Sequence, residues 1–152
     1  MLQRIQTVYI LIVVILLILA FFFPLATFIN NAEVYQLGSF GVSPEIDSFS
    51  SRFPLYAGLF MVIGVALVAV GSFKNRKRQL LLGKINYLLL LITLVMVFLD
   101  IDYVGKSILP AGVLPIYGLS TYFIISCLPL IFLANRAIKK DEALVNSLDR
   151  LR

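Results

Sequence analysis

Residues 80–99 read LLLGKINYLLLLITLVMVFL, and this stretch decides the class of the fold. It is nearly unbroken Leu, Ile and Val, interrupted by Asn86, and Lys84 lies close enough to one end for its ammonium group to reach water. A run of about 20 apolar residues is the length that a helix needs to cross a bilayer. The stretch therefore predicts a transmembrane helix over residues 80–99.

The composition of the whole chain agrees with a membrane protein. Of its 152 residues, 61% are hydrophobic and 14% are charged, and the mean hydropathy is +0.99. Soluble domains average about 45–50% apolar and about 25% charged residues. A water-soluble fold of this size could not hide so much apolar surface, and the length leaves little chain for a separate catalytic domain.

Three further apolar runs cover residues 5–28, 54–73 and 113–134. The first is too long for the apolar core of a cleaved signal peptide, and we expect Pro24 near its outer end to kink the helix rather than end it. The link at residues 74–79 is short, which favours an antiparallel hairpin of the second and third runs. The predicted fold is an all-α bundle of four transmembrane helices in a single membrane domain, residues 1–152.

Two features of these runs indicate helix packing. Ala57, Gly64 and Gly71 recur at seven-residue spacing, and small residues let a neighbouring helix approach closely in lipid. We therefore expect this face to be an interface and the second helix to be central. Asn86 is strongly polar within a leucine-rich span, which favours a hydrogen bond between helices over a place on a transport path.

The distribution of charge predicts the orientation. Eleven of the thirteen Lys and Arg residues lie in the N-terminal segment, in or just after the link at residues 74–79, and in the tail at residues 135–152. The links at residues 29–53 and 100–112 contain only Arg52 and Lys106, together with five of the eight acids. Basic residues stay on the cytoplasmic side. We expect a multi-pass protein of a bacterial inner membrane with both termini in the cytoplasm.

Two segments outside the spans have patterns of their own. Residues 33–42 carry β-formers around Gly38-Ser39, which predicts a short extracytoplasmic β-hairpin. The tail predicts an amphipathic helix that continues the fourth span into the cytoplasm. Its apolar face comprises Ala137, Leu144, Val145, Leu148 and Leu151.

The residue types exclude much chemistry. With one cysteine, Cys127, and no histidine, the chain cannot form an internal disulfide, a Cys or His zinc cluster, histidine-ligated haem or a Ser-His-Asp relay, and we expect no cofactor. Cys127 is interpreted as a small hydrophobe. The acids of the outer links could gather a cation, but no liganding spacing is present, so we favour simple solvation. These acids are Glu45, Asp47, Asp100 and Asp102.

Membrane lipids and proteins are the partners that the sequence favours. The basic link is a topogenic signal that can also contact anionic lipid, and it lacks the aromatic or base-reading groups of a nucleic-acid site. Its basic residues are Lys74, Arg76, Lys77 and Arg78. The apolar face of the tail fits a membrane surface, the chain's own inner links or a partner protein equally well.

Both ends of the chain carry a resemblance. The opening MLQRIQTVY at residues 1–9, the segment ANRAIKKDEALV at residues 134–145 and the closing DRLR at residues 149–152 resemble an uncharacterised family of small four-span inner-membrane proteins of the Bacteroidota. That resemblance implies the four-span topology. It implies no activity and no role for any residue, because the family is a domain of unknown function.

The leading functional hypothesis is a non-enzymatic membrane protein, a structural or accessory subunit that binds a partner through its cytoplasmic tail. A small transporter or channel built from a homo-oligomer is the alternative, although no charged residue at mid-membrane supports ion coupling. A membrane-embedded enzyme that acts on lipid is the third hypothesis. It would need a nucleophile or metal ligands near an interface, and only the outer acids qualify.

Overall fold

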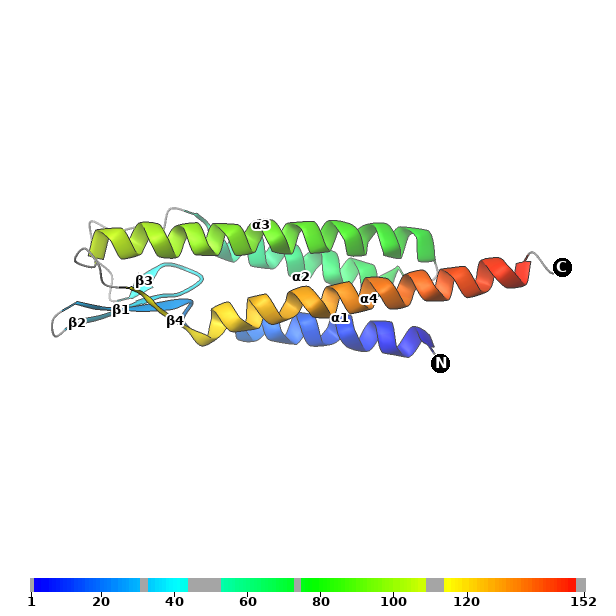
Figure 1. Cartoon of the computed structure of the whole chain (residues 1–152), viewed down its shortest axis with the longest axis horizontal. Helices are drawn as coiled ribbons and strands as arrows, with labels where there is room; N and C mark the ends of the chain where they lie inside the picture. Colours follow the sequence, from blue (N-terminus) through cyan, green and yellow to red (C-terminus); the bar gives the residue numbers. More distant parts are fainter. Residues whose placement is uncertain (1, 31–32, 44–52, 73–74, 109–113, 150–152) are drawn as a thin grey trace.

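The computed structural model describes residues 2–30, 33–43, 53–72, 75–108 and 114–149. Four helices lie side by side along one long axis, with the start of α1 and the end of α4 at one end and a small sheet at the other (Figure 1). The helices are α1 (Leu2–Leu19), α2 (Leu55–Gly71), α3 (Arg76–Ile108) and α4 (Leu119–Asp149). α1 packs on α4, α4 on α3 and α3 on α2, and a lighter contact joins α2 to α1.

The mainly helical class predicted from the sequence is confirmed. Two helical segments, Lys77–Ser107 and Leu119–Ala143, are long and apolar enough to cross a membrane. The apolar parts of the other two helices, Ile5–Leu19 and Leu55–Gly71, are shorter. Length and composition therefore indicate association with a membrane.

The end of α1 differs from the sequence prediction. The helix ends at Leu19, and residues Ala26–Asn30 form strand β1, so the kinked helix expected through Pro24 to Phe28 is wrong. Proline has no N–H to donate to the preceding turn, and its ring crowds the carbonyl four residues earlier. The amides of Phe21 and Phe22 instead bond three residues back, which tightens the last turn before the chain leaves the helix.

The sheet at the far end has four antiparallel strands in the order β3-β2-β1-β4. Strand β2 (Glu33–Leu37) pairs with β1 on one side and with β3 (Val42–Ser43) on the other, and β4 (Ile116–Tyr117) pairs with β1. The predicted hairpin is confirmed between β2 and β3, where the amide of Gly38 bonds the carbonyl of Gly41 at 2.8 Å. Gly41 has a φ of 149°, a conformation that glycine favours. Strands β1 and β4 come from the ends of predicted spans and were not predicted.

The other helices also differ from their predicted bounds. α3 begins at Arg76 and reaches Ile108, so it takes in most of the link at 74–79 and part of the link at 100–112. Asn75 caps its start, because its Oδ1 accepts the amide of Arg78 at 3.1 Å. α4 begins at Leu119 rather than Val113, and Pro129 lies inside it. The predicted helical continuation into the tail is confirmed, through Asp149.

Hydroxyl groups join the sheet to the helices. Ser120 Oγ at the start of α4 donates to the carbonyl of Ala20 at 2.8 Å, and Ser39 Oγ donates to the same carbonyl at 3.3 Å. Thr121 Oγ1 donates to the carbonyl of Leu25 at 2.8 Å. These bonds satisfy carbonyls of the segment that follows α1, so the helix can end within the bundle without losing hydrogen bonds.

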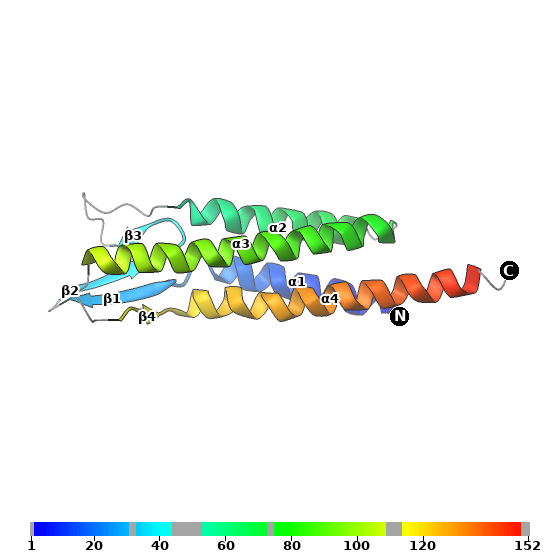
Figure 2. The same cartoon turned by 45° about the horizontal axis from the view of Figure 1, so that its top comes forward.

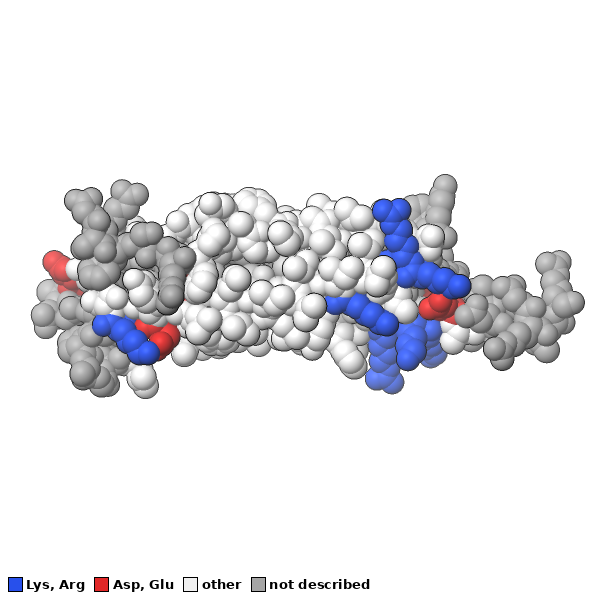
Figure 3. Space-filling view, turned by 90° about the horizontal axis from the view of Figure 1, so that it is seen from above, with Lys and Arg blue, Asp and Glu red and all other residues white. Residues whose placement is uncertain are grey.

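The middle of the bundle is apolar on its surface as well as inside. The interior near the sheet is filled by Val13, Leu17, Leu59, Leu90 and Val97, all fully buried. Figure 3 shows a broad uncharged surface between two charged ends. Large apolar side chains are exposed on that surface, among them Leu11, Ile15, Phe60, Leu67, Leu88, Val95 and Phe132. A continuous apolar surface of this kind marks contact with lipid or another protein.

Candidate partner-binding end of the bundle

Helix α4 projects beyond the other three helices at the end opposite the sheet (Figures 1 and 2). It runs without interruption to Asp149. Ala134 and Ile138 are buried against the bundle, whereas Lys139, Lys140 and Ala143 are exposed. The first part of α4 therefore packs within the bundle, and its C-terminal part extends beyond the other helices. The predicted apolar face at Leu144, Val145 and Leu148 lies outside the described side chains, and Leu151 lies outside the described residues.

Basic side chains gather at the same end, which we call the basic end (Figure 3). The exposed cations come from two neighbouring helices, α3 and α4. They are Lys77, Arg78, Lys84, Arg136, Lys139 and Lys140. α3 and α4 are held together here by Asn135, whose Nδ2 donates to the carbonyl of Gly83 at 3.0 Å. Of the two acids described nearby, Asp141 is buried and forms a polar interaction, and Glu142 is half-buried.

Two of the four residues that the sequence predicts as an anionic-lipid contact lie at this end, and the contact itself stays a prediction. Lys77 and Arg78 lie exposed in the first turn of α3. Lys74 lies outside the described residues, and of Arg76 only the backbone is described. The amide of Asn75 bonds the carbonyl of Ser72 at 3.0 Å, which joins the start of α3 to the end of α2. Lys77 and Arg78 therefore lie at the same end of the bundle as the basic residues of α4.

The predicted packing face of α2 points outward. Ala57, Gly64 and Gly71 are exposed, and a Cβ built on Gly64 or Gly71 meets nothing within 4 Å. The packing role expected for this face is therefore wrong within one chain, and α2 is not central. The close approach occurs instead at Gly58, where an added Cβ would lie 3.1 Å from Thr93 Oγ1. The seven-residue spacing shows that these small residues share one face of α2, but it does not show whether that face points into the bundle or outward.

Asn86, the other expected packing residue, is buried in α3. Its Oδ1 has no hydrogen-bond partner within the described part of the chain. The sequence interpretation missed that Asn86 belongs to a longer pattern. Gln79, Asn86, Thr93 and Asp100 recur every seven residues along α3, and all four are buried. That spacing is visible in the sequence and would have predicted a polar stripe on one face.

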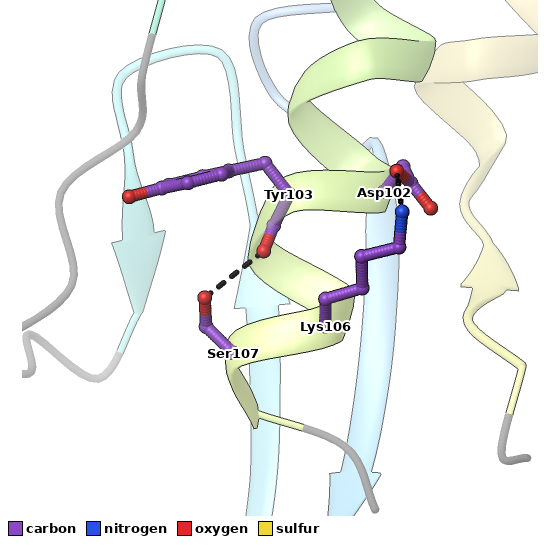
Figure 4. Close-up of polar contacts among 4 residues, drawn as sticks. All are labelled: Asp102, Tyr103, Lys106 and Ser107. Atoms are coloured by element: carbon purple, nitrogen blue, oxygen red, sulfur yellow. Dashed lines mark hydrogen bonds and ion pairs between the residues drawn. The ribbon is translucent and has the colours of Figure 1, made fainter. Parts of the chain in front are cut away.

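Asp100 and Asp102, the two of the four predicted outer acids that the structure describes, do not share one site. Asp100 is fully buried and forms a polar interaction within the fold, whereas Asp102 is exposed and pairs with Lys106 Nζ at 2.6 Å. Figure 4 shows this pair beside the bond from Ser107 Oγ to the carbonyl of Tyr103 at 3.0 Å. Glu45 and Asp47 lie outside the described residues. Within the described ranges, no group of three or more acids or cysteines is placed to hold a metal ion.

Cys127 and three hydroxyl groups of α4 contact backbone carbonyls. Cys127 is fully buried in α4, with its Sγ 3.8 Å from the carbonyl of Val13. Ser120 and Thr121 donate to carbonyls that follow α1, and Ser126 Oγ donates to the carbonyl of Tyr122 at 2.8 Å. These hydroxyl groups therefore stabilise the fold by donating hydrogen bonds to backbone carbonyls.

Comparison with known proteins gives one finding. A family model described as Domain of unknown function (DUF4293) matches residues 2–151, which is nearly the whole chain. No curated protein matches the sequence.

Proposed function

We propose that this chain, which belongs to the DUF4293 family of unknown function, is a non-enzymatic membrane protein that binds a cytoplasmic protein through the projecting end of α4. Its four helices cross the bilayer in this proposal, and the basic end faces the cytoplasm. The projection of α4 beyond the bundle is the observation that carries the proposal.

The four-span arrangement is supported by helix length and by the apolar surface. α1 has 18 residues and α2 has 17, which at about 1.5 Å per residue gives lengths close to the roughly 30 Å hydrocarbon core. Both lie alongside the two longer helices over the uncharged part of the surface. The exposed Leu, Ile, Val and Phe side chains of this region would face lipid tails.

Aromatic side chains support the same placement at the sheet end. Phe21 packs against Phe40 and Phe60, with ring centroids 5.6 Å and 4.8 Å apart, and Phe40 stacks on Tyr56 at 5.8 Å. Elsewhere at this end, Phe98 of α3 meets Tyr117 of β4, with ring centroids 5.9 Å apart. Aromatic rings concentrate at membrane–water interfaces. A belt here would set the outer boundary of the membrane just below the sheet.

The orientation is supported by where the cations converge. Six exposed Lys and Arg residues of α3 and α4 share one end of the bundle, whereas at the other end Lys106 of α3 is paired with Asp102. Basic residues near the ends of spans are retained in the cytoplasm. The projecting end of α4 would then lie in the cytoplasm, where a soluble protein can reach it.

The chemistry of α4 indicates the kind of partner. Arg136, Lys139 and Lys140 precede the segment in which the sequence places Leu144, Val145 and Leu148 on one helical face. A partner with an apolar groove and an acidic rim would complement both features. We therefore propose a cytoplasmic protein with such a groove as the occupant.

Two single substitutions test the proposal. Leu148→Asp places a charge on the apolar face and should abolish co-purification of the partner in mild detergent. Asn146→Asp adds the same charge on the opposite face of the helix and should leave co-purification unchanged. Deletion of residues 144–152 should also release the partner without lowering the amount of protein in the membrane. Equal retention with both substitutions, or loss of the truncated protein from the membrane, would contradict the proposal.

A second candidate function has its own observation. The buried polar stripe of α3 extends from Gln79 to Asp100, which at about 1.5 Å per residue is close to the thickness of the hydrocarbon core. Buried polar groups at this depth favour a transporter or channel over a purely structural bundle. Solute or ion flux in liposomes that contain only this protein would support this alternative.

A further inference from the structure

The interior of the bundle changes in character from the sheet end to the basic end. Near the sheet it is filled by large aliphatic side chains, including Val62 of α2 and Leu90 of α3, both fully buried. Toward the basic end, the buried positions of α2 become Ala66 and Ala69, and α3 contributes Gly83 and Asn86. On α2 and α3, small and polar residues therefore replace bulky apolar ones in the basic half, whereas α1 and α4 keep Ile10 and Ile138 buried there.

Contacts between the helices show which residues lie at the same height along the long axis of the bundle, which we call a level. Cys127 of α4 lies against Val13 of α1, and about two turns nearer the basic end this antiparallel register brings Gln6 level with Ala134. Asn135, next to Ala134, bonds the carbonyl of Gly83.

The register between α2 and α3 shows which of their residues lie at the same level as Gln6 and Ala134. Gly58 lies beside Thr93, so about two turns further Ala66 is level with Asn86. We call this level the polar layer. Its buried residues are Gln6, Ala66, Gly83, Asn86 and Ala134, and Ile10 packs beside Ala66 and Ala134.

Two atoms of the polar layer lack the partners that buried groups need. Gln6 Nε2 is a donor and Asn86 Oδ1 is an acceptor, and neither has a hydrogen-bond partner among the residues that the structure describes. Each side chain is only 3% exposed. A buried polar group without a partner is costly, and native proteins satisfy almost all of them with protein groups or with water. An unmatched donor and an unmatched acceptor at one level fit a ligand that can both accept and donate.

Polar side chains also lie between this layer and the basic end. Gln79 is buried on the same face of α3 as Asn86, and Asp141 is buried on α4. In the opposite direction, Leu90, Thr93 and Val97 occupy the next buried positions of α3, and Ile131, Cys127 and Ile124 those of α4. The Thr93 hydroxyl donates to the carbonyl of Leu89 in its own helix at 2.9 Å, so it needs no further partner. The basic side of the polar layer thus contains the buried polar residues Gln79 and Asp141 beside Ile138, whereas the buried side chains on its sheet side are mainly apolar.

We propose that the polar layer binds water, which enters from the basic end and bridges Gln6 Nε2 and Asn86 Oδ1. The apolar half of the bundle closes this hydrated site toward the sheet. In the membrane, the site is a blind vestibule that opens to the cytoplasm. Only this last statement rests on the proposed topology, because hydration of the layer itself can be measured in detergent.

Cysteine accessibility to Ag⁺, a thiol probe small enough to follow water, tests the site. The two matched positions are Ala66 and Val62, which are fully buried and one turn apart on α2. In a Cys127→Ala background, Ala66→Cys should be modified at least about tenfold faster than Val62→Cys, because a buried thiol reacts only where water reaches it. Native Cys127, in the apolar half, should be as slow as Val62→Cys. Adding Asn86→Leu to Ala66→Cys should remove the difference.

A measurement on the unmodified protein makes the test independent of these variants. In detergent-solubilised wild-type protein, the side-chain amide of Gln6 should show NMR cross-peaks to water, and Thr93 and Leu90 should not. Equal Ag⁺ reactivity at positions 62 and 66 in correctly folded variants would overturn the proposal. Absence of water contact at Gln6 would overturn it as well. Neither result bears on the binding of a partner by α4.

Discussion

Ser120 Oγ donates a hydrogen bond of 2.8 Å to the carbonyl oxygen of Ala20, across 100 residues of sequence. The bond joins the start of α4 to the segment where α1 has just ended, and both residues are fully buried. A carbonyl left without a donor in an apolar interior is costly. This contact therefore helps to explain why an apolar run that could have continued as a helix ends at Leu19 and turns into the sheet.

The first prediction removes that donor. Ser120→Ala leaves a buried carbonyl with a weaker set of donors and should lower the free energy of unfolding by about 1–3 kcal/mol. Ser126→Ala on the same helix is the control, because its exposed hydroxyl bonds only within its own helix. Unfolding in mixed detergent, followed by circular dichroism, gives both values. Equal stability of the two variants would show that the Ala20 contact contributes little.

The second prediction concerns Gly118, which lies where α4 meets the segment after α1. An added Cβ would collide with the backbone carbonyl of Pro24, and backbone cannot move aside as a flexible side chain can. Gly118→Ala should destabilise the fold by about 1–3 kcal/mol. Gly64→Ala should cost nothing or stabilise slightly, because its Cβ points into open space and alanine favours helix. A large loss at Gly64 would instead indicate that a second chain covers α2.

How much of this fold could be predicted depends on the range of the interactions that determine each part. The class, the apolar part of α3 at residues 80–99, the continuation of α4 and the Gly38–Gly41 turn follow from local composition and turn residues. The end of α1 does not, because its carbonyls are satisfied by Ser39 and Ser120, far along the chain. The pairing of β1 with β4 is equally distant in sequence.

The sequence also could not predict which side of each helix points into the bundle. In an apolar span both the lipid side and the interior accept Leu, Ile and Val, so hydrophobic periodicity is weak. Gly64 therefore gave no sign that it faces outward. The polar stripe was different, since the seven-residue spacing of Gln79, Asn86 and Thr93 can be read directly from the sequence.

The third prediction separates two acids of α3 that lie two residues apart. Asp100 is fully buried with a polar partner, and Asp102 forms an exposed ion pair with Lys106. Asp100→Ala should cost about 1–3 kcal/mol, because it breaks a buried polar interaction. Asp102→Ala should cost less than about 1 kcal/mol, and that small effect should shrink further in salt. The same unfolding assay at low and high salt checks both values.

The fourth prediction concerns pH at the sheet. The Tyr35 hydroxyl donates to the Glu33 carboxylate, and this hydrogen bond, followed by desolvation and the negative charge, raises the pKa of Tyr35 above its usual value of about 10. A raised pKa means that the interaction stabilises the fold below pH about 10 and is lost as the pH rises through the folded-state pKa. Ultraviolet titration, with Tyr35→Phe as the blank, should show a lower midpoint in Glu33→Gln. An unchanged midpoint would contradict the contact.

The last prediction tests the four-span topology with single cysteines at exposed positions. Ser43 on β3 and Ser107 near the end of α3 lie at the sheet end, and Asn75 lies at the basic end. In sealed vesicles, an impermeant thiol reagent should modify Ser43→Cys and Ser107→Cys from one side and Asn75→Cys only from the other. Cys127 needs no removal, because it is fully buried. Because α3 alone separates Asn75 from Ser107, labelling of these two from the same side would show that α3 does not cross the membrane. Labelling of Ser43 from the side of Asn75 would show the same for α2, and the basic end could then no longer be assigned to the cytoplasm by its charge.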